Sequence, residues 1–536
     1  MNYLDLFPSK SSTVHAVLEQ RARRLPDHPF LMVRDRVLTY ADLNDGANRL
    51  AHGLIARGVR PGDRVAVMMT GSVSYVLAWF AIAKAGAVEV PVNTAYKGEL
   101  LRYILKTADV AAVIADEAFV AELRAAGVGL PGLGGLIVNP ADGGAGPGTL
   151  NGTMAVERHD PDLPVSGGDP ACVIFTSGTT GPSKGVVITH HHEVSFGVFF
   201  DEIVSMRGDD VAYNYLPFFH IAAKFLTLGA MLVDGRMALE PVFSLSRFWD
   251  DVWRYSATVV VAVGGLCHML RSLPARPDDA DNTLRLVYAV PVPAEFQEEF
   301  ERRFGVTLVE GYGSTESNLI VYSRPGETPR GSCGRPSPHF EVAILDEDGH
   351  RLGPGESGEI CVRPTLPNTL MKEYLGMPGK TLEAMQGYWF HTGDRGVIDE
   401  AGFVYFQDRI KDSIRRRGEN ISSFEVERLL NAHPDVAESA VVAIPSEVGE
   451  DEVKAVVVRR PGSALDGEAL LRFAAETMPY FMVPRYIAFR DSLPRTPTQK
   501  VRKVDLRREG VTDDTWDRER AGLRVTRDGL RDTRVA

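Results

Sequence analysis

Residues 64–92 read RVAVMMTGSVSYVLAWFAIAKAGAVEVPV. RVAVMM (64–69) and VEVPV (88–92) are short apolar runs typical of buried strands, whereas SYVLAWFAIAKAGA (74–87) has the length of a helix. The alternation continues with a predicted helix and a predicted strand at GELLRYILKTA (98–108) and AAVIAD (111–116). Strands that alternate with helices predict βαβ units and parallel sheets covered by helices on both faces.

The composition is that of an ordinary globular protein and excludes several classes of function. With 536 residues, 44% hydrophobic, the chain is long enough for more than one domain. The net charge of -12 argues against nucleic-acid binding, which needs a basic surface. The longest apolar stretch, ATVVVAVGGLCHML (257–270), is too short to span a membrane, so no integral membrane association is expected.

Four cysteines, far apart, form no CxxC pair, so their spacing suggests neither a disulfide framework nor a zinc site: Cys172, Cys267, Cys333 and Cys361. The N-terminus, MNYLDLFPSK, has an acid where a signal peptide carries positive charge. We therefore expect a reducing cytoplasmic location.

The character of the sequence changes near residue 408. There the charged segment DRIKDSIRRRGEN (408–420) leads into a compact β/α region that ends around residue 505. We predict an N-terminal domain over 1–408 and a small C-terminal domain over 409–536. The charge-rich residues 506–536 are expected to lie on the surface or to be partly disordered, and NPADGGAGPGTLNG (139–152) reads as a surface loop.

A loop rich in glycine and hydroxyl groups, TSGTTGPSKG (176–185), joins the predicted strands ACVIFT (171–176) and VVITH (186–190). No helix follows the lysine, and Gly185 stands where a P-loop has Ser or Thr, so this is a different phosphate-binding device. Its hydroxyls and backbone amides can surround an anion, and Lys184 supplies a positive charge. The alternative is a solvated glycine-serine turn.

Four later motifs carry side chains suited to a nucleotide. GYGSTES (311–317) follows the predicted strand FGVTLVE (304–310), at the carboxyl end where open α/β sheets bind ligands. Its ring, hydroxyl and carboxylate could contact adenine, phosphate and magnesium: Tyr312, Thr315 and Glu316. The other motifs are WFHTGD with Asp394, FQDRIKD with Arg409, and PRTPTQKVRK with Lys500. Each alone is more often structural, but the ordered set favours a nucleotide site.

With these motifs in this order, the chain resembles the adenylate-forming superfamily, which contains acyl- and aryl-CoA synthetases, peptide-synthetase adenylation domains and beetle luciferases. The likeness runs from VPVNTAY (90–96) to Lys500. VYAVPVPAEF (287–296) stands where most members have a Gly-Gly-Ala-Pro run, and this departure favours the carnitine-CoA ligase-like branch. The resemblance implies an α/β fold with a large N-terminal domain of layered β-sheets and flanking helices, plus a small mobile C-terminal α+β domain.

The resemblance also implies an ATP- and Mg²⁺-dependent ligase that forms an acyl-adenylate, releases pyrophosphate and transfers the acyl group to coenzyme A. The catalytic residues implied are Lys500, Thr315, Glu316, His220 and Lys184. The nucleotide-binding residues implied are Thr176, Ser177, Gly178, Thr179, Thr180, Gly181, Gly311, Tyr312, Gly313, Asp394, Arg409 and Lys411. Glu316 and Thr176 would bind magnesium, and Lys411 would be the hinge about which the small domain rotates.

Several alternatives stay open. The acceptor could instead be a carrier-protein thiol, or the enzyme could activate nitrite for an aromatic amine, as diazotase-like members do; a non-catalytic nucleotide-binding relative is a third class. The sequence leaves open whether the chain forms a homodimer. The acid pocket is expected among 220–224 and 263–267 with Ser317 and Asn318, and Lys224 either pairs with a charge on the substrate or faces outward.

Three departures from the family pattern also raise questions. Arg417 and Gln499 replace glycines, and Tyr288-Ala289-Val290 would add bulk near the adenine and substrate pocket. The run Arg415–Arg417 either binds CoA phosphates or is a solvated face. The run His190–His192 is interpreted as structural, because consecutive side chains point in different directions.

Overall fold

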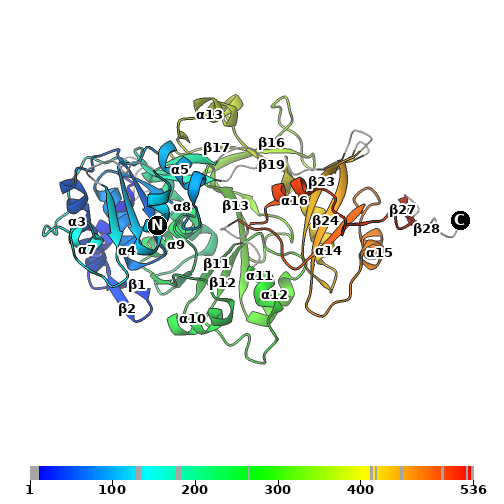
Figure 1. Ribbon diagram of the computed structural model, residues 1–536, viewed down its shortest axis with the longest axis horizontal. Helices are drawn as coiled ribbons and strands as arrows, with labels where there is room; N and C mark the ends of the chain where they lie inside the picture. Colours follow the sequence, from blue (N-terminus) through cyan, green and yellow to red (C-terminus); the bar gives the residue numbers. More distant parts are fainter. Residues whose placement is uncertain are drawn as a thin grey trace.

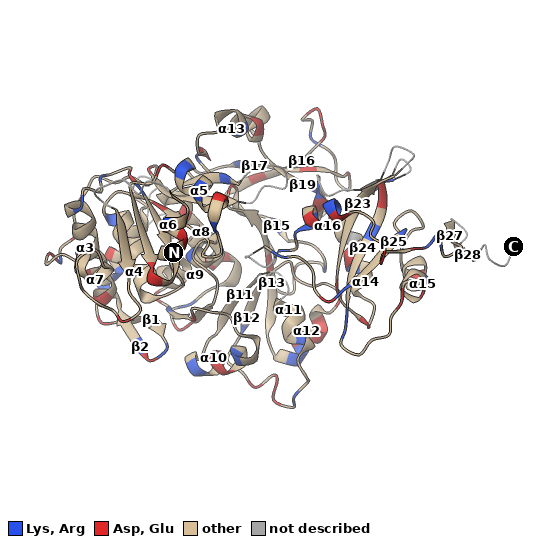
Figure 2. Cartoon of the chain, in the orientation of Figure 1, with Lys and Arg blue, Asp and Glu red and all other residues tan. Residues whose placement is uncertain are grey.

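The structure, a computed structural model, describes residues 11–127, 135–176, 183–263, 266–410, 414–416, 419–446, 451–496, 500–526 and 529–532. Two large sheets form the N-terminal part, and a smaller α/β unit follows at the C-terminal end (Figure 1). Acidic and basic residues are interspersed over both parts, and the central strands of the large sheets contain few of them (Figure 2). No helix in the described part is long and apolar enough to cross a membrane.

The seven-stranded sheet contains the strands predicted from residues 64–116. Its order is β18 (Glu373–Tyr374), β8 (Lys184–Thr189), β7 (Pro170–Thr176), β4 (Val88–Pro91), β3 (Arg64–Met68), β5 (Ala112–Asp116) and β6 (Leu136–Asn139). Strands β7, β4, β3, β5 and β6 are parallel, while β8 and β18 pair antiparallel at one edge. The prediction of a parallel sheet is therefore correct except at that edge.

The nine-stranded sheet is also parallel in its centre and antiparallel at both edges. Its order is β15 (Arg335–Pro336), β14 (Asn318–Tyr322), β13 (Thr307–Ser314), β12 (Leu286–Val290), β11 (Val259–Val263), β9 (Val211–Asn214), β10 (Arg236–Leu239), β1 (Pro29–Val33) and β2 (Arg36–Thr39). The apolar stretch at 257–270 is thus β11 followed by α11 (Leu266–Ser272). A buried strand and an adjoining helix explain its hydrophobicity.

Both faces of the central strands are buried, which accounts for their continuous apolar runs. In β3, Val65 and Val67 enter the core between the sheets, and Ala66 and Met68 enter the outer core formed with α5 (Gly98–Thr107) and α6 (Val120–Ala125). The outer face of the nine-stranded sheet packs against α10 (Phe248–Tyr255), α11 and α12 (Gln297–Phe304).

Helices α4 (Val73–Lys84), α8 (His190–Val204) and α9 (Ile221–Leu232) are buried on nearly all sides. Helix α8 packs against β7 and β8 of one sheet and β13 and β14 of the other, so it lies between the two sheets. The same core includes α2 (Val14–Arg24) and α3 (Tyr40–Ala56), and α7 (Leu150–Thr153) forms one turn inside the predicted 139–152 loop.

His190–His192 form the first turn of α8, all three are buried, and burial lowers the pKa of each ring to between about 3 and about 4. These rings make different contacts: that of His190 meets His15 edge-on, and that of His192 stacks on Phe196. The structural interpretation of this run is confirmed.

A four-stranded antiparallel sheet follows, in the order β16 (Phe340–Leu345), β17 (Gly358–Pro364), β19 (Phe390–Ile398) and β20 (Val404–Arg409), with α13 (Pro378–Ala384) beside it. The last unit has a sheet in the order β23 (Val436–Pro445), β24 (Asp451–Arg459), β25 (Tyr486–Arg490) and β26 (Trp516–Asp517). It also contains a hairpin of β21 (Ile414–Arg416) and β22 (Glu419–Ile421), and the helices α14 (Ser423–Asn431), α15 (Gly467–Thr477) and α16 (Lys503–Glu509).

The charged tail is more ordered than predicted. Strand β26 joins the sheet of the small unit, and β27 (Leu523–Thr526) pairs with β28 (Gly529–Asp532). Leu523 is fully buried, and the buried guanidinium of Arg518 donates to the carbonyl of Val483 at 3.0 Å. A few apolar side chains among many charges are enough to dock this segment, so the folded region does not end near 505.

Candidate active site

The candidate site lies where both parts of the chain meet the ends of several strands. The β13–β14 turn, β19, β20, the adjoining ends of β7 and β8 and the start of α9 contribute from the N-terminal part. Lys500 contributes from the C-terminal unit. Residues as far apart in sequence as His220 and Lys500 are thereby brought near each other.

Tyr312, Asp394 and Arg409 form one connected group. The Tyr312 hydroxyl donates to Asp394 Oδ2 at 2.7 Å, and Arg409 Nε lies 2.9 Å from Asp394 Oδ1. Asp394 and Arg409 face each other across β19 and β20. Burial raises the pKa of Asp394, and Arg409 and the Tyr312 hydroxyl oppose that shift. The carboxylate has further acceptor capacity for hydroxyl groups of a ligand.

A second group surrounds the expected phosphate loop. Thr176 at the end of β7 pairs with Lys184 at the start of β8, so these two residues form the base of the loop. The Lys184 ammonium lies over the ring of Tyr374, 3.8 Å from its centroid, and the Tyr374 hydroxyl donates to Glu316 at 3.2 Å. Tyr374 thus links Lys184 to Glu316, a contact that no sequence motif indicated.

At two of the predicted glycines, neighbouring atoms lie too close to leave room for a side chain. A Cβ atom at Gly313 would lie 1.9 Å from the Asn318 carbonyl oxygen, and one at Gly311 would lie 2.3 Å from the Tyr288 hydroxyl. The β13–β14 hairpin, whose turn includes Thr315 and Glu316, can therefore close only with glycine at these positions. Because β13 extends to Ser314, Tyr312 lies within this strand rather than after its end.

Lys500 reaches this site from the C-terminal unit. Lys500 is an exposed residue, but the protein that surrounds its ammonium lowers its pKa, as does Arg409, while Asp394 and Glu316 raise it. His220 is the N-cap of α9, and its Nδ1 accepts from the backbone N–H of Ala222 at 3.1 Å. Burial, and to a lesser extent Lys500, lowers the pKa of His220 to about 4. Lys500 therefore lies within electrostatic reach of Asp394, Glu316, Arg409 and His220.

Lys224 belongs to the protein interior. It is fully buried on α9, forms an ion pair with Glu89, lies 3.2 Å from Glu193 and stands over the ring of Trp79. The option of an outward-facing lysine is therefore wrong, and the protein itself supplies the countercharges that would have come from a substrate.

Ser317 and Asn318 are likewise buried, and their polar groups bond within the protein, with Ser314 and Ser195 respectively. In the described conformation these groups support the hairpin rather than face an open pocket.

Two further expectations need correction. Arg416 is buried and pairs with Glu452 at 2.7 Å, so it is neither a solvated side chain nor a ligand for CoA phosphates. Tyr288 is buried beneath Gly311 and meets Phe200 edge-on, so its bulk enters the core rather than the adenine pocket. The expectations for Ser177–Gly181, Gly264, Gly265, Lys411, Arg417 and Gln499 concern positions outside the described residues.

Comparison with known sequences assigns the family. The AMP-binding enzyme profile matches residues 18–375, and the profile of the AMP-binding enzyme C-terminal domain matches residues 425–500. The chain belongs to the AMP-binding enzyme family. It is an adenylate-forming enzyme of the acyl-CoA ligase type, which confirms the resemblance predicted from the motifs.

Relatives and solved structures cover nearly the whole length. A crotonobetaine/carnitine–CoA ligase of Salmonella paratyphi B is 33% identical over 482 residues, which are 88% of this chain and 93% of that protein. The ATP-bound structure of MatB from Rhodopseudomonas palustris has a TM-score of 0.81 and 29% identity, covering 92% of this chain and 98% of that one. A benzoate CoA ligase from Burkholderia xenovorans LB400 has the same TM-score at 25% identity, covering 92% and 99%.

Proposed function

We propose that this AMP-binding enzyme is an ATP-dependent carboxylic acid–CoA ligase that works through an acyl-adenylate. The position of Lys500 supports the proposal, because this residue of the small domain lies within electrostatic range of Glu316, Asp394 and His220 of the large one. Such an arrangement suits the first half-reaction, in which a carboxylate oxygen attacks the α-phosphorus of ATP and the bond to the departing pyrophosphate breaks.

Lys500 supplies the charge that this step needs. Two anions must approach each other, so the barrier falls when a cation is held between them. Lys500 bridges the attacking carboxylate and the α-phosphate, while Thr315 contacts that phosphate. Lys184 and the 176–181 loop hold the departing pyrophosphate. The Tyr312 ring packs on adenine, and Asp394 and Arg409 hold the ribose.

His220 is uncharged in this scheme. Its pKa of about 4 means that the ring is neutral at physiological pH, and Nδ1 already accepts from Ala222. The other ring nitrogen therefore carries the proton. His220 can donate one hydrogen bond to the substrate carboxylate. Because the ring is neutral, it does not form an ion pair that would stabilise the carboxylate before it reacts.

The oxygen donors near the phosphate side fit Mg²⁺. Glu316 offers a carboxylate and Thr176 a hydroxyl, which are the ligand types that this hard cation prefers. When bound, the ion neutralises charge on the β- and γ-phosphates. Tyr374 orients Glu316 by its 3.2 Å hydrogen bond, so the carboxylate is held beside the loop rather than free to turn away.

The second half-reaction needs a different arrangement of the domains. We place the domain boundary after residue 408, one residue before β20 ends, and the hinge at Lys411. Rotation there would withdraw Lys500 and open the adenylate to a thiol; the sulfur attacks the acyl carbon, the thiol proton is lost and AMP leaves. The crotonobetaine/carnitine–CoA ligase relatives support CoA as the acceptor and a zwitterionic acid as one substrate candidate.

A product analysis tests this function. The protein is mixed with Mg-ATP and a panel of acids that includes crotonobetaine, carnitine and benzoate, with and without CoA, and the products are identified by mass spectrometry. Acyl-CoA and AMP that form only when CoA is present are the expected result. Adenylate and pyrophosphate without any thioester would overturn CoA as the acceptor and favour a carrier-protein thiol or nitrite activation.

A further inference from the structure

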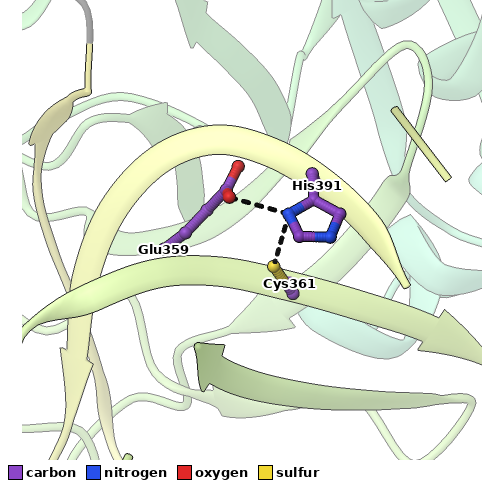
Figure 3. A group of neighbouring side chains, drawn as sticks. All are labelled: Glu359, Cys361 and His391. Atoms are coloured by element: carbon purple, nitrogen blue, oxygen red, sulfur yellow. Dashed lines mark hydrogen bonds and ion pairs between the residues drawn. The ribbon is translucent and has the colours of Figure 1, made fainter. Parts of the chain in front are cut away.

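Three side chains that commonly bind metal ions converge beside the part of β19 that carries Asp394. Glu359 and Cys361 lie on β17, and His391 lies opposite them on β19 (Figure 3). His391 Nδ1 is 2.7 Å from Glu359 Oε2 and 3.4 Å from Cys361 Sγ. One ligand atom from each of the three residues lies within 4.8 Å of the other two.

The other ring nitrogen of His391 fixes the hydrogen-bonding roles in this cluster. Nε2 lies 3.3 Å from the Gln386 carbonyl oxygen, which can only accept, so Nε2 carries a proton. In the neutral ring, Nδ1 is then an acceptor that faces a carboxylate oxygen, also an acceptor. Two acceptors, His391 Nδ1 and the Glu359 oxygen, therefore face each other, and the Cys361 thiol can donate its proton to only one of them. A cation bound by all three groups would replace that proton.

We propose that Glu359, Cys361 and His391 form a binding site for Zn²⁺. A carboxylate, an imidazole and a thiolate are the ligands that this borderline-soft ion selects, whereas Mg²⁺ and Ca²⁺ prefer oxygen alone. The bond from Nε2 to a carbonyl is the outer contact that orients metal-binding histidines. Glu359 and His391 are each 21% exposed, so solvent reaches the site and can supply a fourth ligand.

The site is joined by short hydrogen bonds to the residues of β19 that precede Asp394. Glu359 Oε1 accepts from the backbone N–H of Gly393 at 2.8 Å, and the Thr392 hydroxyl donates to the Ile360 carbonyl at 2.7 Å. A cation on Oε2 would leave Oε1 bonded to Gly393, so the carboxylate would connect the ion to β19. Bound Zn²⁺ would thus hold the segment that precedes Asp394.

The spacing of the cysteines could not indicate this site. Cys361 has no cysteine neighbour within reach of a zinc motif, and its partners come from the same strand two residues away and from an adjacent strand. In a strand, residues two apart point to the same side, so Glu359 and Cys361 share one face of β17. Pairing with β19 then adds His391.

Metal titration of the full chain tests the proposal. The protein is stripped with a chelator, titrated with Zn²⁺ by calorimetry, and separately loaded with Co²⁺ to record the near-ultraviolet band of a cobalt–thiolate bond. The test variants are Cys361→Ser and Glu359→Gln; in the latter, the amide oxygen of the new side chain can still accept from Gly393. The control is His350→Gln, since His350 pairs with Asp346 on the surface without a cysteine.

We expect one Zn²⁺ per chain in the wild type and in His350→Gln, and a cobalt–thiolate band in both. Affinity should fall at least about tenfold in Cys361→Ser and in Glu359→Gln, because each loses a ligand. Equal affinity in all four proteins, or a cobalt spectrum without the thiolate band, would overturn the proposal in favour of a shared proton. If Cys361→Ser does not fold, the Zn²⁺ affinity of Glu359→Gln and the spectrum of the Co²⁺-loaded wild type still test the proposal.

Discussion

The hydroxyl of Tyr312 donates a 2.7 Å hydrogen bond to Asp394. This bond joins the nine-stranded sheet to the four-stranded sheet across 82 residues of sequence. The ring of Tyr312 also lies 6.1 Å from that of Phe406 on β20. The residue expected to stack on adenine thus positions the residue expected to bind ribose. Each depends on the other for its geometry.

Tyr312→Phe separates these two roles. The ring that packs on adenine is kept, but the buried Asp394 carboxylate loses a donor, which costs about 1–3 kcal/mol. We expect the KM for ATP to rise by roughly 10- to 100-fold in acid-dependent ATP–pyrophosphate exchange. Tyr388→Phe is the matched control, because Tyr388 is 90% exposed. An unchanged KM in Tyr312→Phe would show that the bond does not support nucleotide binding.

Arg416 should act on stability rather than on CoA binding. Arg416→Ala leaves Glu452 as an unpaired buried charge, and such a change costs about 3–5 kcal/mol. Arg472→Ala removes an exposed helical pair with Glu468 and should cost at most about 0.5 kcal/mol. Thermal unfolding measures both. A stable Arg416→Ala protein with a raised KM for CoA would restore the phosphate-binding interpretation.

His190 should make the fold sensitive to acid. Its pKa is lowered to about 3 by burial and by His15, whereas the unfolded chain takes up a proton near 6.5. The contribution of the neutral His190 ring to the free energy of unfolding is therefore complete above about pH 6.5, and it is lost as the pH falls toward 3. His190→Asn keeps an acceptor for the Val14 amide but cannot titrate.

Urea unfolding at pH 7.5 and pH 5 provides the measurement. Between pH 7.5 and pH 5, the free energy of unfolding of the wild type should fall by about 2 kcal/mol more than that of His190→Asn. Equal losses in the two proteins would show that His190 is protonated in the folded state.

The order of strands and helices in the central sheets could be predicted because local periodicity encodes it. Residues 64–116 form β3, α4, β4, α5 and β5 within a few residues of the predicted bounds, since both faces of these strands are buried. The motif residues Tyr312, Asp394 and Arg409 also lie together as expected. Their roles in nucleotide binding stay a prediction.

Charged residues were harder to interpret, because their partners are distant in sequence. Lys224 is neutralised by Glu89 and Glu193, so it does not face outward. Arg416 is neutralised by Glu452, so it is not solvated as its charge-rich run suggests. Trp516 and Leu523 attach the C-terminal tail by apolar contacts, and their partners also lie far away in the sequence. Sequence patterns do not report such long-range pairs.

Lys411→Pro tests the hinge. A proline restricts the backbone rotation on which the second domain arrangement depends. Pyrophosphate release should continue at a rate close to that of the wild type, while thioester formation from a supplied acyl-adenylate and CoA should fall by about 100-fold or more. A parallel loss of both half-reactions would place the hinge elsewhere or show a folding defect.

The most direct measurement of the central claim compares the two half-reactions in Lys500→Ala, with Lys380→Ala as a control on the exposed helix α13. Loss of a cation from the site of charge development should lower acid-dependent ATP–pyrophosphate exchange by about 100- to 1,000-fold. Thioester formation from supplied acyl-adenylate and CoA should stay near the wild-type rate, because Lys500 leaves the site before that step. Equal losses in both half-reactions, or an exchange rate unchanged by the substitution, would contradict the account.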